Sequence, residues 1–167
     1  MTDPSRVDVC AACGLVVAGG SEGCHALFQE LLARDFGDYR YGRVHRLMVD
    51  AYAVQHAESY GRSAKSFAAH LGGLCCHFEH PGDPEALPAL QRWLNGRVPL
   101  ERPEPPRLRG AVTVAVAHAA TDPEAYALAV ERWARSAWEA FGELHDTARA
   151  YVATALARGG RERSGAL

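Results

Sequence analysis

The sequence lacks several features that would place it in a familiar class of protein. It has no apolar run of the roughly 20 residues that span a bilayer, and its first residues are polar with an early Asp3, unlike a secretory signal. It has no basic excess either, since 18 Lys and Arg stand against 20 Asp and Glu, so nucleic acid is not an expected partner. We therefore expect a cytoplasmic protein that binds neither a membrane nor nucleic acid.

The motifs of the common enzyme classes are also missing. Gly19-Gly20 and Gly72-Gly73 lack the spacing and context of a phosphate-binding loop, and there is neither a GxSxG elbow nor an HExxH helix. The five cysteines are an odd number, which argues against a framework of disulfides in a cytoplasmic chain. The sequence thus names no reaction and leaves open whether the protein is an enzyme.

What the sequence does contain is typical of one globular domain. Its 167 residues are 48% hydrophobic and 23% charged, which excludes a disordered chain. We expect a single helical domain over residues 1–158, which includes a metal-binding segment at 7–24, and a flexible polar tail over 159–167.

The spacing of apolar residues predicts helices along most of the chain. Four prolines in 99–106 exclude a helix there, and alternating valines make 112–120 ambiguous, although a lone strand would have no partner. We predict a short helix at 112–120 and longer ones at 22–35, 43–57, 63–78, 84–94 and 123–157. The expected fold is all-α: a bundle of four main helices with an N-terminal zinc knuckle.

Cysteine and histidine residues carry the clearest chemical signal. Cys10 and Cys13 have the spacing with which two thiolates on one tight turn bind a single ion, and Gly14 permits that turn. The same CxxC spacing occurs in redox motifs, but those stand in a βαβ context that is missing here. Cys24, at the start of the first predicted helix, is a plausible third ligand.

The fourth ligand follows from the lengths of two helices. The first helix rises about 16 Å over the eleven residues from Cys24 to Asp35, at ~1.5 Å per residue. If the next helix runs antiparallel, the eleven residues from His45 to His56 bring His56 back to the level of Cys24. His25 follows Cys24 directly, and neighbouring side chains on a helix point about 100° apart, so it is a poor fourth ligand. We predict a Zn²⁺ site made of Cys10, Cys13, Cys24 and His56; the alternative is a set of unliganded thiols beside a core histidine.

A second group of polar residues lies on predicted helix faces. Asp50 stands in a helix that is apolar on nearly all sides, so a buried carboxylate there needs a partner, and His70 or an arginine is at the right height. His145 lies at the edge of the last apolar face. Asp50, His70 and His145 are therefore candidate catalytic residues or ligands of an open, histidine-rich metal site. The simpler interpretation is a structural Asp50–His70 pair and a core His145.

Several segments resemble a bacterial protein family known only as a domain of unknown function. They lie between about residues 10 and 152 and are Cys10-Ala-Ala-Cys13-Gly14-Leu15, the segment after Cys24, Val44 to His56, Ser66 to Cys75 and Trp133 to Ala140. Where the family usually has proline after the Gln-His pair, this chain has Ala57, and where it tends to have two histidines, this chain has Leu144-His145. The resemblance implies the site residues and no reaction. The helices are also similar in outline to DinB-like four-helix metalloproteins.

Two functions remain as hypotheses. In the first, zinc is structural and the protein is a binding or regulatory module whose partner is another protein or a small molecule. In the second, the protein is a metalloenzyme acting on a small molecule through Asp50, His70 and His145. Four protein ligands leave no open coordination position, which favours the first role for the cysteine site.

Overall fold

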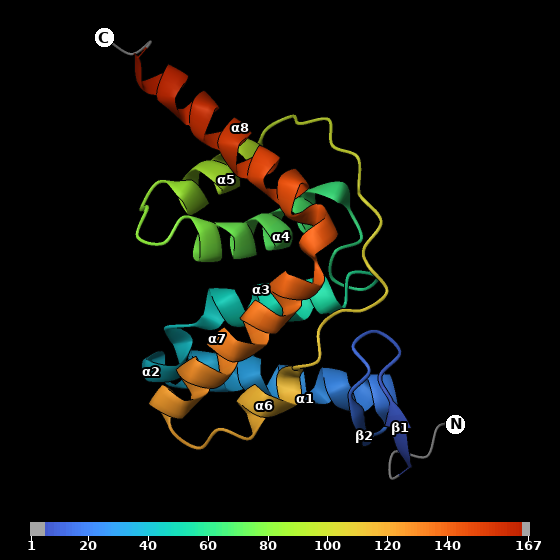
Figure 1. Ribbon diagram of the computed structural model, residues 1–167. Coiled ribbons are helices and arrows are strands. Elements are labelled where there is room, and N and C mark those ends of the chain that lie inside the picture. Colours follow the sequence, from blue (N-terminus) through green and yellow to red (C-terminus); the bar gives the residue numbers. More distant parts are fainter. Residues whose placement is uncertain (1–5, 165–167) are drawn as a thin grey trace.

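The computed structural model describes residues 6–164. The chain is mainly helical, with one short two-stranded sheet at its N-terminal end (Figure 1). In chain order the elements are β1 (Val7–Val9), β2 (Val16–Ala18), α1 (Gly20–Gly37), α2 (Tyr39–Gly42), α3 (His45–Gln55), α4 (Ala64–Glu79), α5 (Ala86–Asn95), α6 (Val114–His118), α7 (Pro123–Ala140), the 3₁₀ helix η1 (Gly142–Leu144) and α8 (His145–Ser164).

The hairpin β1–β2 corrects the all-α prediction. The strands pair antiparallel, with Val7 opposite Ala18 and Val9 opposite Val16. The sequence pattern missed them because each strand has three residues, too few for an alternation to stand out. The segment read as a knuckle and loop is therefore a hairpin whose turn holds Cys10 and Cys13.

Most of the predicted helices are confirmed, including the short one at 112–120. Ser63 and Asp122 cap α4 and α7 as Ser/Asp N-caps do, accepting from the amides of Ser66 and Ala125. The helix predicted from residue 84 begins only at Ala86, because the Asp83 carboxylate accepts from the Glu85 amide in a turn before it.

The predicted last helix, 123–157, is two helices. α7 ends at Ala140, the chain passes through η1, and α8 begins at His145. The apolar stripe continues across this break, which is why periodicity alone did not reveal it, although Gly142 marks the position. α8 continues to Ser164, beyond the predicted start of a flexible tail; residues 1–5 and 165–167 of the predicted domain and tail lie outside the described residues.

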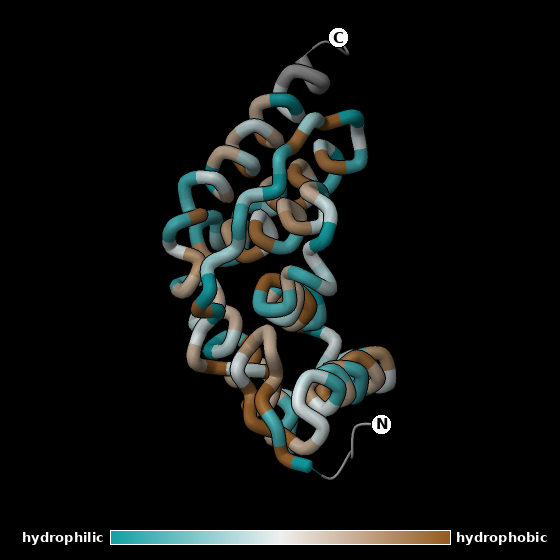
Figure 2. The backbone as a smooth tube through the Cα atoms, turned by 90° about the vertical axis from the view of Figure 1, so that its right-hand side faces the viewer, coloured by the Kyte–Doolittle hydropathy of each residue, from teal (hydrophilic) through white to brown (hydrophobic). Residues whose placement is uncertain are grey.

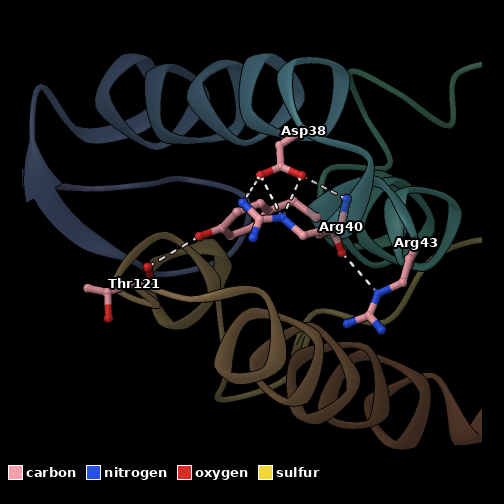
Figure 3. A network of polar contacts seen from close by, with 5 residues as sticks. Asp38, Arg40, Arg43 and Thr121 are labelled. Atoms are coloured by element: carbon pink, nitrogen blue, oxygen red, sulfur yellow. Dashed lines mark hydrogen bonds and ion pairs between the residues drawn. The ribbon is translucent and has the colours of Figure 1, made fainter.

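The connection between α1 and α3 contains a short helix, α2. The Asp38 carboxylate accepts from the Arg40 backbone amide at 2.9 Å and from the Arg40 guanidinium, and Arg43 Nε donates to the Arg40 carbonyl at 3.0 Å (Figure 3). The Tyr41 hydroxyl donates to Thr121 O at 3.2 Å, which ties α2 to the segment before α7. These bonds fix the reversal that makes α1 and α3 neighbours.

The helices form two groups that share α3. α4, α5 and α8 pack together at one end of the molecule, and α1, α2, α6 and α7 pack together at the other, beside the hairpin (Figure 1). α3 contacts both α4 and α7. The helical class is therefore confirmed, whereas a single four-helix bundle is not the arrangement found.

One continuous apolar core runs through both groups. Its largest fully buried side chains include Trp133, Tyr52, Tyr126, Phe28 and Phe67. The hydropathy colouring shows hydrophobic and hydrophilic residues alternating along most helices, as expected of elements that bury one face (Figure 2). None of the described helices has both the length and the hydropathy that crossing a membrane requires.

A long irregular segment, residues 96–113, runs along the side of the molecule from α5 to α6 (Figure 1). Its prolines exclude regular structure, so side chains hold it in place. Arg102 donates to Ala57 O and Gly61 O, and the buried Gln55 amide donates to the carbonyls of Arg109 and Val112. The segment is thereby fixed to the residues that follow α3.

Candidate metal centre

The turn of the hairpin positions the first two cysteines. The Cys10 amide donates to Leu15 O at 2.8 Å, and the Gly14 amide donates to Cys10 O at 2.9 Å. Gly14 has φ of +78°, a left-handed conformation that favours glycine. This tight backbone turns the side chains of Cys10 and Cys13 to the same side, away from solvent.

The third cysteine comes from the second turn of α1. The helix approaches the hairpin closely at Gly23, where a Cβ atom would lie only 1.8 Å from Ala18 O, so a side chain cannot be accommodated. The Ala11 amide donates to Ser21 Oγ at 3.0 Å, a further link between turn and helix. Cys24, fully buried, thus lies against the cysteine turn.

The fourth residue, His56, stands directly after α3. Its Nδ1 lies 2.8 Å from Tyr52 O. Because a carbonyl oxygen only accepts hydrogen bonds, Nδ1 carries the proton and Nε2 presents its lone pair to the sulfurs. Metal-binding histidines are commonly oriented by such a bond on the other ring nitrogen.

The four side chains converge on one point. One ligand atom from each of Cys10, Cys13, Cys24 and His56 lies within 4.8 Å of all the others. His56 Nε2 is 3.4 Å from Cys24 Sγ and 3.6 Å from Cys10 Sγ, and Cys13 Sγ is 3.7 Å from Cys24 Sγ. Tetrahedral zinc with bonds of ~2.3 Å to sulfur and ~2.0 Å to nitrogen has edges of about 3.8 Å between sulfurs and about 3.5 Å between sulfur and nitrogen. The predicted set is therefore positioned to hold a metal ion.

Aromatic rings hold the imidazole in place. The Tyr52 ring stacks on His56 with centroids 3.8 Å apart, and Phe28 stacks on the other face of Tyr52 at the same distance. Tyr60 meets both Phe28 and Tyr52 edge-on. Sequence reasoning did not identify this stack, because a spacing cannot show that three rings lie against one another.

The sulfurs differ in acidity even before an ion binds. A hydrogen bond from the Cys24 thiol lowers the pKa of Cys13 to about 4, whereas the same contact and burial raise the pKa of Cys24. One thiolate is thus present at neutral pH. An ion that takes all three sulfurs as thiolates has to displace protons, as metal binding to cysteine generally does.

Two histidines left out of the predicted site have polar partners of their own, and two further cysteines are buried elsewhere. His25 Nε2 lies 2.9 Å from the Tyr60 hydroxyl, and His45 Nδ1 lies 3.0 Å from the buried Asp35 carboxylate. Cys75 and Cys76 are buried in α4, and burial raises their pKa values to about 12 and about 11. Both behave as small core residues.

Asp50 has both of the partners that its burial required. Its carboxylate accepts from Arg46 Nε at 2.8 Å and lies 2.8 Å from His70 Nδ1. Gly73 provides the space, because a Cβ there would lie 2.2 Å from Asp50 Oδ2. Arg46 Nη2 also donates to Ala69 O. The cluster joins α3 to α4 with its hydrogen bonds satisfied.

His145 does not join this cluster into a metal site. Its ring stacks on Trp138 at 3.8 Å, and its Nε2 lies 2.8 Å from Trp138 O. Over residues 6–164, the only group of three or more cysteine, histidine or acidic residues close enough to share an ion is the cysteine–histidine set. The chain changes direction between α7 and α8, which explains why the His145 ring faces Trp138 near the end of α7.

The sequence analysis missed Gln55 and Arg109, which surround the end of α3. Gln55 Oε1 accepts from Trp133 Nε1 at 2.8 Å, and Arg109 Nη1 donates to Gln55 O and to Glu58. The sequence offered one signal for Gln55: a polar glutamine stands next to His56 in a helix that is apolar on nearly all sides, so it needs hydrogen-bond partners. These bonds fix the position from which His56 reaches the sulfurs.

Fold and site together define a helical protein with a candidate cysteine–histidine metal centre at its N-terminal hairpin. The chain belongs to a family of unknown function, DUF5946, which matches residues 8–142. That range contains all four candidate ligands. Comparison with curated proteins and with solved structures gave no match.

Proposed function

We propose that the protein binds Zn²⁺ and that the ion has a structural role. The agreement of three measured separations with the edges of a zinc tetrahedron carries this proposal. Three sulfurs and one imidazole nitrogen are soft and borderline ligands, which suit zinc far better than magnesium or calcium. Four protein ligands complete the coordination shell, so no position is left for a substrate.

The role of the ion is to attach the hairpin to the helical body. The hairpin buries little apolar surface of its own, since Val7, Val9 and Val16 are all more than half exposed. Its cysteines, however, reach His56 at the end of α3, 46 residues beyond Cys10. Metal binding in such small segments supplies folding free energy directly.

We further propose that the fixed hairpin serves as a binding or regulatory module. A groove of about 670 Å³ lies between the cysteine turn and residues 107–111. Its walls combine apolar residues such as Val9 and Leu108, which are 53% and 83% exposed, with Arg107. Exposed apolar residues beside a charged rim are typical of sites that bind a protein or a small molecule.

Metal analysis of the purified chain tests the zinc assignment. We expect one zinc per chain by elemental analysis and by mass spectrometry under non-denaturing conditions. Cys13→Ser should lose the ion, while Cys76→Ser, which changes a buried cysteine outside the site, should keep it. A bare-chain mass after expression in zinc-replete medium, or equal zinc content in both variants, would contradict the proposal.

A further inference from the structure

A separate cavity of about 120 Å³ lies between the last turn of α5 and the outer half of α8. Both views place this end of the molecule opposite the hairpin (Figures 1 and 2). Arg92, Arg97 and Arg158 line the cavity together with Trp93, and no acidic residue is among its lining residues. We call it the α5–α8 cavity.

Positive charge gathers around this cavity although the whole chain has a formal net charge of −2. Lys65, the only lysine in the sequence, donates from Nζ to Gly96 O at the edge of the cavity. Glu85 pairs with Arg92 at 3.6 Å, and the C-terminal end of α5 adds about half a negative charge. These two groups together compensate about one and a half of the four positive charges.

The arginines come from both sides of the cavity. Arg97 lies just past the end of α5, and Arg158 lies on α8. Arg92 reaches from α5 to α8, since its Nη2 is 3.5 Å from the position that a Cβ on Gly159 would take. Guanidinium groups placed on two walls can approach one small anion from different directions.

Trp93 also lines this cavity, and its indole nitrogen is buried. In the part of the chain that the structure describes, its Nε1 is the only buried side-chain nitrogen or oxygen atom without a hydrogen-bond partner. Such atoms are rare in native proteins and commonly mark a position that an absent ligand, ion or water completes.

We propose that the α5–α8 cavity binds the phosphate group of a small molecule. A phosphate monoester carries about −1.5 to −2 charges at neutral pH and accepts several hydrogen bonds, which suits a cavity lined by three arginines. Arginine binds such groups through paired N–H donors. The volume accommodates one group of this size, whereas a nucleic-acid strand needs a groove that follows its backbone.

Nuclear magnetic resonance on the full-length, zinc-loaded protein tests the proposal. Inorganic phosphate is added at constant ionic strength, with chloride as the balancing anion, and the Trp93 indole N–H signal is followed. Trp93→Phe identifies that signal by its loss. We expect a saturable shift, downfield if a phosphate oxygen accepts from Nε1. A shift that grows without saturation would overturn the proposal.

Matched variants separate a site from general charge effects. Arg97→Ala and Arg158→Ala should each weaken phosphate binding about tenfold, since each removes a charge-assisted hydrogen bond. Arg132→Ala removes the same charge from an exposed position on α7 and should leave binding unchanged. Equal weakening in all three variants would show that no specific site exists.

Three further anions define the ligand class. Sulfate should compete with phosphate, and acetate should bind much more weakly, because it carries one charge and two oxygens. A simple alkyl phosphate should bind at least as tightly as inorganic phosphate; its exclusion would refute a phosphorylated small molecule as the ligand. Tighter binding of single-stranded oligonucleotide at the same residues would refute it as well.

Discussion

Removal of the metal ion should unfold the hairpin and leave the helices that are remote from it intact. Fixing the dozen or so residues of β1, the cysteine turn and β2 costs at least ~12 kcal/mol of backbone conformational entropy. Leu15 and Val17 are only partly buried, so each returns less than the ~1.5–3 kcal/mol of a fully buried side chain. The hydrogen bonds of the hairpin return only ~0.5–1.5 kcal/mol each, so the hairpin is marginal at best by its own contacts.

The proposed zinc ion would supply the missing stability, because structural zinc sites contribute ~10–16 kcal/mol in small peptides at neutral pH. Hydrogen exchange measured by mass spectrometry should therefore show loss of amide protection over residues 7–19 in chelator-treated protein and in Cys13→Ser. α5 and α8 should keep their protection, and Cys76→Ser should keep it everywhere. Undiminished protection of the hairpin in metal-free protein would refute the reasoning, since the hairpin would then be stable by its own contacts.

The remaining predictions concern the core. Gly73→Ala should lower the free energy of unfolding by about 2–4 kcal/mol in urea denaturation, because its Cβ would displace the buried Asp50 carboxylate. Gly142→Ala is the control: no atom lies within 4 Å of the added Cβ, so the free energy of unfolding should change by less than ~1 kcal/mol. Equal effects would contradict the role given to Gly73. Gln55→Met should cost about 3 kcal/mol or more, since it leaves two carbonyls and the Trp133 N–H without partners, and should speed tryptic cleavage within residues 96–113; unchanged cleavage would argue against Gln55 as an anchor. Burial raises the pKa of Asp35, against the opposing effect of the hydrogen bonds from Tyr126 and His45. The protonated Asp35 side chain therefore stabilises the fold. This contribution is complete below about pH 4 and is lost as the pH rises through the folded-state pKa. Relative to Asp35→Asn, the wild-type protein should therefore lose about 1.4 kcal/mol of stability per unit of raised pKa as the pH increases, and parallel stability profiles would exclude this account.

The metal centre could be predicted from the sequence because its geometry reduces to the rise of two helices. Cys24 and His56 lie at the same height if α1 and α3 are antiparallel neighbours, and the short helix α2 makes them so. The contact between Asp50 and His70 followed from the same arithmetic. Helical rise is nearly invariant, so these positions depend on little else.

Features that depend on tertiary packing could not be obtained in this way. The strands of the hairpin are too short to show a period, and their pairing is fixed by the tight turn and by the contact of Gly23 with Ala18. The break between α7 and α8 interrupts an apolar stripe that continues on both sides. Because of this break the His145 ring stacks on Trp138, a contact that residue spacing cannot predict.

The position of His56 has a consequence for the order in which the chain acquires its structure. Three sulfurs occur within the first 24 residues, yet the imidazole that completes their set is supplied only after α3 has been made. During synthesis, the leading segment emerges from the ribosome before its last ligand and has an incomplete coordination shell until then. The cysteine-bearing segment can thus become fully ordered only after α3 has been made, and its thiols stay open to oxidation or to a competing metal in the meantime.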